Sequence, residues 1–128
     1  MSDMSAWRVF VIDDDELFTQ MLQVVLDADG RFAVVGTAAS VGQGLTGIES
    51  QRPDLLLLDH RLPDALGAHA ARGLRSLAPL AAVVVLSGGP ASVDFAELGV
   101  DLWVDKTAVL TLPDVLHELM TVRSVQPT

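Results

Sequence analysis

The chain has 128 residues, half of them hydrophobic, and a formal net charge of −9 with only eight lysines and arginines. This length corresponds to about one domain, and the acidic balance argues against a nucleic-acid-binding face while suiting a divalent cation. The absence of cysteine excludes disulfides, thiolate metal sites and cysteine nucleophiles.

Targeting features are missing from the sequence. No apolar stretch reaches membrane-spanning length, and the first residues, MSDMSAW, lack the basic and apolar regions of a secretory signal. We therefore expect a cytoplasmic protein with no membrane partner. The three histidines are not spaced as a pair, so a zinc site is not expected.

Five short apolar runs predict strands, and longer segments with helical periodicity separate them. The expected strands are residues 7–12, 32–36, 54–58, 81–86 and 101–104. Continuous apolar strands indicate a sheet covered on both faces, and their alternation with helices indicates parallel strands joined by right-handed crossovers. The sequence thus predicts one doubly wound α/β domain.

Three of the expected helices have recognisable faces or ends. The first ends near Gly30, and its apolar face is expected to contain Leu17, Met21, Leu22, Val25 and Leu26. A capping box of Ser40 and Gln43 opens the second, which is expected to run to about Glu49. The last is expected to open at Thr111.

Polar side chains stand at the ends of the expected strands. They are Asp13, Asp14, Asp15 and Glu16 after the first, Asp59 after the third, Ser87 with Gly88 and Gly89 after the fourth, and Lys106 after the fifth. In doubly wound folds, sites form beyond the carboxyl ends of the strands. Converging carboxylates repel one another unless a cation joins them, and Mg²⁺ prefers such hard oxygen ligands.

These groups suit the transfer of a phosphoryl group to a carboxylate. Asp14 and Asp59 are expected to bind Mg²⁺ directly, with Asp13 hydrogen-bonded to a coordinated water. Lys106 supplies a mobile positive charge and Ser87 a hydroxyl, and such groups neutralise charge on the equatorial oxygens during transfer. The product is expected to be an aspartyl phosphate.

The chain resembles the receiver domain of two-component response regulators. The resemblance rests on "VIDDDELF", "DHRLPDALG", "VVVLSGG" and "WVDKTA", and it runs from about Arg8 to Val122. It implies a flavodoxin-like (βα)5 fold with strand order 2-1-3-4-5, one receiver domain over residues 1–128 and no effector domain. "FAVVGTAASVGQGL" and the pair Thr107-Ala108 resemble the subclass with LuxR-type helix-turn-helix effectors. The chain is then either a stand-alone receiver or an N-terminal piece of a transcription factor, and we favour the second.

The resemblance also implies roles for the residues at the strand ends. Asp59 is the expected phosphoacceptor, Lys106 binds a phosphoryl oxygen, and Ser87 swings toward the phosphate. The expected ligands of Mg²⁺ or Mn²⁺ are Asp13, Asp14, Asp59 and the backbone carbonyl of Arg61. Pro63 and Gly67 shape the loop that aims the nucleophile.

Three further residues carry expectations. Trp103 occupies the position of the family's switch aromatic, and Arg61 and Gly89 are expected to modulate the lifetime of the phosphoryl group. The Arg61 side chain is expected to do so by extending over the pocket to Asp15 or Glu16.

The implied partners follow from the same family. A sensor histidine kinase donates the phosphoryl group from a phosphohistidine, and an effector domain or downstream protein receives the signal. The signalling face is expected to combine the fourth helix, the fifth strand and the last helix. A homodimer on phosphorylation is possible in such proteins, and this segment is not expected to bind nucleic acid itself.

The chain departs from the family pattern after Ser87. The stretch to Gly99 is about three residues shorter than usual and begins with two glycines and a proline, so the fourth helix is expected to be short, about two turns, or shifted. Leu102 replaces a common glycine, and Trp103 is bulkier than the usual tyrosine or phenylalanine. Both changes affect the rotamer change that the resemblance implies for the aromatic side chain at position 103.

Three other functions are open to the same residues. A receiver-like interaction module that is never phosphorylated fits the shortened segment after Ser87. A haloacid dehalogenase-like phosphatase would use Asp13 as nucleophile, but it leaves Asp59 and "RLPDALG" without a role. A flavodoxin-like cofactor binder is set aside, because four acids after the first strand would repel a phosphate.

Overall fold

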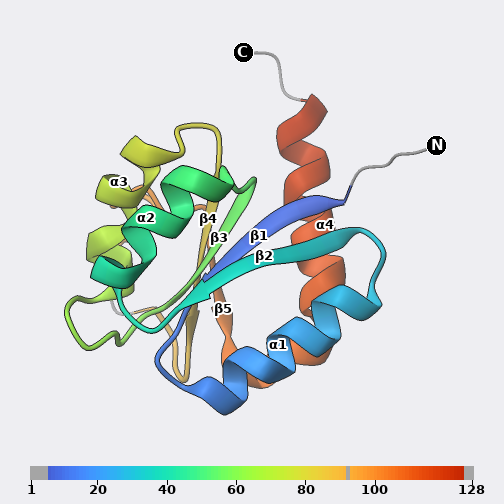
Figure 1. Ribbon diagram of the computed structural model, residues 1–128, viewed down its shortest axis with the longest axis horizontal. Helices are drawn as coiled ribbons and strands as arrows, with labels where there is room; N and C mark the ends of the chain where they lie inside the picture. Colours follow the sequence, from blue (N-terminus) through green and yellow to red (C-terminus); the bar gives the residue numbers. More distant parts are fainter. Residues whose placement is uncertain (1–5, 92, 126–128) are drawn as a thin grey trace.

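The computed structural model describes residues 6–91 and 93–125. Five parallel strands form one sheet in the order β2-β1-β3-β4-β5 (Figure 1). They are β1 (Trp7–Ile12), β2 (Phe32–Ala38), β3 (Leu55–Asp59), β4 (Ala82–Ser87) and β5 (Leu102–Asp105). The expected strand order is confirmed, and each expected strand lies within two residues of the observed one.

Helices cover both faces of this sheet. One face carries α1 (Glu16–Ala28) and α4 (Leu112–Val125), and the other carries α2 (Val41–Gln51) and α3 (Gly67–Leu77) (Figure 1). A 3-10 helix, η1 (Lys106–Thr111), leads from β5 into α4. None of the helices in the described part of the chain is long and apolar enough to cross a bilayer.

The strand interiors are apolar at every position because both faces are buried. In β3, Leu55 and Leu57 pack toward α1 and α4, whereas Leu56 and Leu58 pack toward α2 and α3. All four leucines are 0 % exposed. Full burial of one leucine side chain contributes about 1.5–3 kcal/mol, so β3 is a firmly held support for Asp59 at its tip.

The buried face of α1 differs from the expected one. Leu22 and Leu26 are fully buried, but Leu17 is 78 % exposed, Met21 41 % and Val24 69 %. The prediction that Leu17 and Met21 belong to the core face is therefore wrong. Helical spacing identifies apolar stripes but does not decide which stripe meets the sheet.

The prediction of a short fourth helix between β4 and β5 is also wrong. Within residues 88–91 and 93–101 the chain forms only turns and bends. The Leu98 N–H donates to the Phe95 carbonyl, and Gly99 has a positive φ of 87°. Glycines and a proline begin this segment, and so short a stretch cannot offset the cost of helix nucleation.

Candidate functional site

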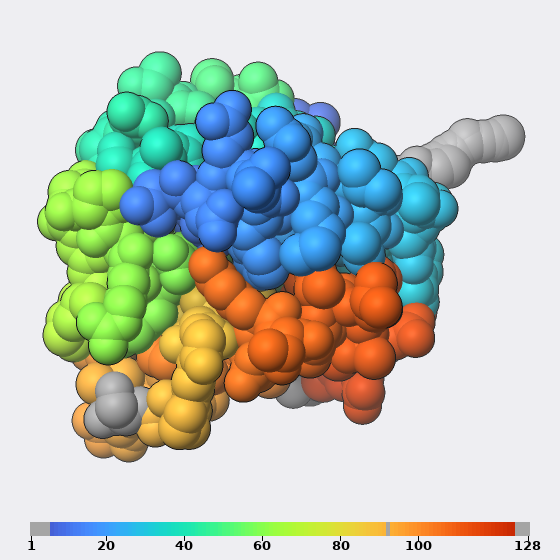
Figure 2. Space-filling model, turned by 90° about the horizontal axis from the view of Figure 1, so that it is seen from below, coloured from blue at the N-terminus to red at the C-terminus, as the bar shows by residue number. Residues whose placement is uncertain are grey.

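The carboxyl ends of β1 and β3 bring three carboxylates together. Asp13 and Asp14 follow β1, Asp59 ends β3, and one oxygen of each lies within 4.8 Å of the others. Asp13 is 4 % and Asp59 9 % exposed, whereas Asp14 is open to solvent. Figure 2 looks onto this end of the molecule, where the blue start of α1, the green loop after β3 and the orange segment after β5 meet.

Lys106 lies between two of these carboxylates. Its Nζ is 2.9 Å from Oδ2 of Asp13 and 3.3 Å from Oδ1 of Asp59. The same Nζ lies 4.4 Å from the centre of the Phe18 ring, a cation–π contact. These contacts hold the ammonium group within reach of any group attached to Asp59.

The charges of the site shift the pKa values of Asp59 and Lys106. Burial raises the pKa of Asp59 and the charge of Asp13 raises it further, against the opposing effects of Lys106 and the Arg61 backbone N–H. Burial alone would lower the pKa of Lys106, but its hydrogen bond to Asp13 and the two carboxylate charges hold that pKa above its ordinary value. The positive charge of Lys106 thus does not fully offset burial and the charge of Asp13 at Asp59.

The donor set fits a hard divalent cation. Both oxygens of Asp13 already accept hydrogen bonds, Oδ1 from the Asp15 backbone N–H at 2.8 Å and Oδ2 from Lys106. Asp14 is exposed and the Asp59 side chain is 12 % exposed, against 1 % for Asp13. Direct binding by Asp14 and Asp59, with Asp13 behind a coordinated water, stays a prediction. A cation joining three carboxylates offsets the repulsion that raises the pKa of Asp59.

The loop after β4 forms the far wall of a hollow beside Asp59. The hollow has a volume of about 660 Å³ and is lined by Asp59, His60, Arg61, Ser87, Gly88, Gly89, Pro90 and Lys106. A Cβ atom built at Gly88 or Gly89 would meet nothing within 4 Å, so this wall is open. The Ser87 Oγ accepts a hydrogen bond from the Gly89 N–H at 3.3 Å.

His60, which lines the hollow, packs against Trp103. The rings of His60 and Trp103 lie 4.7 Å apart, and Trp103 Nε1 donates to the Gly89 carbonyl at 3.1 Å. His60 is 8 % exposed, and burial lowers its pKa, as do the charges of Arg61 and His69. His60 is thus a packed residue of the loop that follows β3.

The loop after β3 is built around Gly67. Its N–H donates to the His60 carbonyl at 2.7 Å, and a Cβ atom there would lie only 2.3 Å from the Asp59 carbonyl oxygen. Arg61 and Leu66 form an antiparallel bridge across the loop. Only glycine allows α3 to begin so close to the strand that carries Asp59.

Asp64 ties the same loop to α2. Its carboxylate accepts hydrogen bonds from the N–H groups of Val41 at 3.0 Å and Gly42 at 2.9 Å. These bonds, to Gly42 first and then Val41, lower the pKa of Asp64. Together they cap the start of α2, where backbone N–H groups lack helical partners.

Arg61 does not make the expected contact. Its side chain is exposed and forms no ion pair with Asp15 or Glu16 in the part of the chain described. Asp15 instead caps α1, its Oδ1 accepting from the Phe18 N–H. The influence of Arg61 and Gly89 on phosphoryl lifetime stays a prediction.

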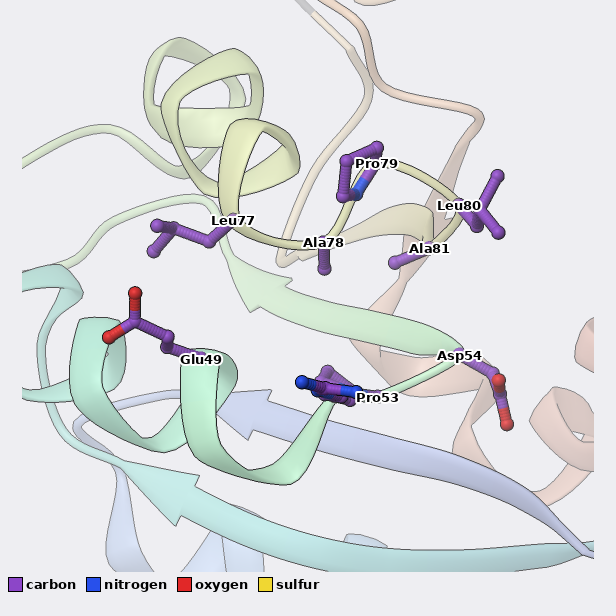
Figure 3. A pocket seen from close by; sticks show the side chains of 9 residues that line it. Glu49, Pro53, Asp54, Leu77, Ala78, Pro79, Leu80 and Ala81 are labelled. Carbon is purple, nitrogen blue, oxygen red and sulfur yellow. The ribbon is translucent and has the colours of Figure 1, made fainter.

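A second hollow lies at the other end of the sheet (Figure 3). Its volume is about 420 Å³, and it lies between the α2–β3 and α3–β4 connections. The residues around it are Glu49, Arg52, Pro53, Asp54, Leu77, Ala78, Pro79, Leu80 and Ala81. None of the three clustered carboxylates lines it, whereas Asp59 lines the first hollow and Asp13 and Asp14 line a further one beside α1.

Two residues of the site escaped sequence analysis. Phe18 of α1 contacts Lys106 of η1, and Asp64 caps α2, whose Gly42 lies 22 residues earlier in the sequence. Phe18 stood in the apolar pattern of α1 and Asp64 followed a loop proline, but neither feature names its partner. Long-range contacts of this kind appear only in the folded chain.

Comparison with known proteins gives consistent matches. Residues 9–111 match the response regulator receiver domain family. The DNA-binding transcriptional activator DevR/DosR of Mycobacterium tuberculosis is 40% identical over 72 residues, 56% of this chain and 33% of that protein. The signal receiver domain of NarL from Mycobacterium tuberculosis has a TM-score of 0.78 at 25% identity, covering 96% of this chain and 100% of that one. A LuxR-family response regulator from Aurantimonas sp. shares the fold, with a TM-score of 0.80 at 20% identity over 94% of this chain and 86% of that one.

The curated relatives are longer than this chain, which spans between 26% and 44% of their length. Their names include DNA-binding regulators and protein-glutamate methylesterases. The expected resemblance to regulators of the LuxR type is confirmed by the matches to DevR/DosR and NarL, whereas the match to the Aurantimonas protein shows the fold alone. The family match covers most of the sequence and includes every residue of the acidic site, so this chain belongs to the response regulator receiver domain family.

Proposed function

We propose that this chain is a phosphoacceptor receiver of a two-component system, with Asp59 as the acceptor. The observation that supports it best is the placement of Lys106, whose Nζ faces both Asp59 and Asp13 beside an open hollow. The family to which the chain belongs accepts phosphoryl groups and does not act as a conventional enzyme.

In the proposed transfer, an Asp59 oxygen attacks the phosphorus of a phosphohistidine. The new Asp59 O–P bond forms as the histidine N–P bond breaks, and the released imidazole keeps the electron pair and takes up a proton. Lys106 stabilises one phosphoryl oxygen and the Ser87 hydroxyl donates to another, because charge grows on these oxygens during transfer. The open wall at Gly88 and Gly89 admits the incoming group.

Asp13, Asp14 and Asp59, with the Arg61 carbonyl, would hold Mg²⁺ or Mn²⁺ in this site. The ion supplies charge neutralisation to the acceptor and to the phosphoryl group. Asp13 fixes the position of Lys106 through a 2.9 Å ion pair, and the Asp15 N–H orients Asp13 in turn.

The proposed donor is a sensor histidine kinase that approaches over α1. Leu17, Met21 and Val24 form an exposed apolar stripe along this helix, and Leu110 of the adjacent η1 is 82 % exposed. Figure 2 shows the blue helix and the orange segment side by side on the face that holds the site. Exposed acids at residues 14–16 lie at the start of the stripe, so an apolar helix with basic residues near one end is the complementary partner.

The proposed output is a change in a linked effector or a downstream protein, in the cytoplasm. Relatives that regulate transcription favour a DNA-binding effector in a longer protein, and the net charge of −9 argues against nucleic-acid contact by this segment. Phosphorylation-dependent pairing of two receivers belongs to the same proposal.

A second candidate is an interaction module that is never phosphorylated. It is favoured by the turns that replace the expected helix after β4, because that helix was expected to belong to the output face. Such a module would bind its partner equally well with Asp59 replaced by asparagine. Nothing favours a haloacid dehalogenase-like enzyme, since the side chain of its nucleophile, Asp13, is 1 % exposed and already bonded at both oxygens.

Intact-mass measurement after incubation with acetyl phosphate and Mg²⁺ tests the proposal. We expect the wild type to gain one phosphoryl group, and both the Asp59→Asn variant and a sample with excess chelator to gain none. A wild type that binds Mg²⁺ and still gains nothing would refute the proposal in favour of the interaction module.

A further inference from the structure

Trp103 connects two segments that border the hollow beside Asp59. Its Nε1–H donates to the Gly89 carbonyl at 3.1 Å, and its ring lies 4.7 Å from the His60 ring. His60 directly follows Asp59, and Gly89 lies two residues after Ser87. The indole thus joins the segment that carries the nucleophile to the segment that carries the hydroxyl.

Trp103 and Ser87 lie on the same face of the sheet. Trp103 pairs with Val85 of β4, and Ser87 is two residues further along that strand, where side chains return to the same face. Phe95 packs on the indole at 6.0 Å. No helix lies between β4 and β5 in the described residues, and Phe95 of this connection packs against Trp103 of β5 instead.

The hydrogen bonds around Gly89 leave the Ser87 hydroxyl proton available. A serine hydroxyl has one hydrogen to donate and two lone pairs that accept. The Gly89 N–H donates to the Ser87 Oγ and so uses a lone pair, not the hydrogen. The hydrogen can therefore point into the hollow beside Asp59. Trp103 restrains Gly89 from its other side, through the carbonyl.

We infer that Trp103 is a positioning residue for the phosphoryl group, acting through Gly89 and Ser87 while its own ring stays in place. The inference rests on the function proposed above for Asp59. A donor that is oriented in advance stabilises developing charge without reorganisation during the reaction. This role needs an indole, because phenylalanine has no N–H to donate and tyrosine carries its donor elsewhere on the ring.

The first set of variants is Trp103→Phe, Ser87→Ala and the double variant, with Trp7→Phe as the matched control. Trp7 packs on Phe32 and His117 at the opposite end of the sheet. The measurement is the rate at which acetyl phosphate phosphorylates each protein at saturating Mg²⁺. Trp103→Phe is expected to slow this rate about two- to twelvefold, the effect of one net hydrogen bond.

The double variant separates positioning from a general structural effect. If Trp103 acts through Ser87, Trp103→Phe slows the reaction less than twofold in the Ser87→Ala background. Mg²⁺ affinity is expected to stay within twofold of wild type in the Trp103→Phe protein, and Trp7→Phe is expected to behave as wild type. Equal rates for Trp103→Phe and wild type would overturn the inference. It would also be overturned if the rate reductions of Trp103→Phe and Ser87→Ala multiplied in the double variant.

Hydrogen exchange of the two indole N–H groups tests the contact in the wild type, without any variant. The Trp103 Nε1–H is expected to exchange at least tenfold more slowly than that of Trp7, both before and after addition of beryllofluoride with Mg²⁺. Exchange of Trp103 as fast as Trp7 would overturn the inference. A wild type that accepts no phosphoryl group would overturn the proposed function and this inference together, whereas phosphorylation unaffected by Trp103→Phe would remove the inference alone.

Discussion

Replacing Gly67 by alanine is expected to damage both the stability and the reactivity of the site. Gly67 opens α3 directly beneath the end of β3, and its N–H donates to the His60 carbonyl at 2.7 Å. The added methyl group would lie 2.3 Å from the Asp59 carbonyl oxygen and 3.1 Å from its carbonyl carbon. Both contacts are with backbone, which cannot rotate away as a side chain can.

The magnitude follows from these distances. Ordinary contact begins at 3.4 Å, so strand and helix must separate by about 1 Å. Overpacking of this kind costs about 1–3 kcal/mol, and loss of the hydrogen bond to His60 costs about 0.5–1.5 kcal/mol more. The free energy of unfolding is thus expected to fall by about 1.5–4.5 kcal/mol. A displacement of about 1 Å at the nucleophile is also expected to slow phosphorylation about 100-fold.

Urea unfolding and the rate of phosphorylation by acetyl phosphate measure the two effects. Gly73→Ala is the matched control, since Gly73 lies in the same helix and a Cβ atom there meets nothing within 4 Å. That substitution is expected to raise the free energy of unfolding by about 0.5–1 kcal/mol. A Gly67→Ala protein as stable and as reactive as the Gly73→Ala protein would refute the steric reasoning.

Four further substitutions test the electrostatics and the packing. The pKa of Asp59 is raised in the folded protein, so the stability of the protein falls as pH rises through that pKa. Asp59→Asn is therefore expected to raise the midpoint of thermal unfolding at pH 7 without Mg²⁺. An unchanged or lower midpoint would contradict this. The ion pair with Arg31 lowers the pKa of Asp29 from 3.8 to about 2. The difference in stability between the wild type and Arg31→Ala is therefore expected to shrink as pH falls from 3.8 toward 2. Urea midpoints of both proteins across that range measure it. Leu17→Ala is expected to change the free energy of unfolding by less than about 0.5 kcal/mol, whereas Leu22→Ala is expected to cost about 2–5 kcal/mol; similar losses in the two proteins would place Leu17 in the core after all.

The strands could be predicted from the residue pattern, whereas the sheet order was what the resemblance to receiver domains implied. A strand covered on both faces must be apolar at every position, and "LLLLD" shows this with no polar interruption. The carboxyl ends of parallel strands share one edge, so the acids after β1 and β3 and the lysine after β5 had to lie near one another. These conclusions need only the order of residues along each strand.

The helix faces and the loop after β4 could not be predicted in the same way. Both stripes of α1 are apolar, and the sheet selects the one that contains Leu22 and Leu26 over the one that contains Leu17. Between β4 and β5, a helix would form only if its packing offset the free-energy cost of helix nucleation. The rings of Phe95 and Trp103 pack against each other there without a helix. Such balances depend on neighbours that the local sequence does not contain.

The sequence by itself determined which residues meet at the acidic edge, because strand periodicity and parallel topology leave few alternatives for Asp13, Asp59 and Lys106. The tertiary structure alone decided how those residues are held. The Lys106 ammonium lies against Phe18, and Asp64 caps α2 from another loop. The physical reason is range: periodicity and strand ends are local properties of the chain, whereas a hydrogen bond or ring contact between distant segments exists only after the chain has folded.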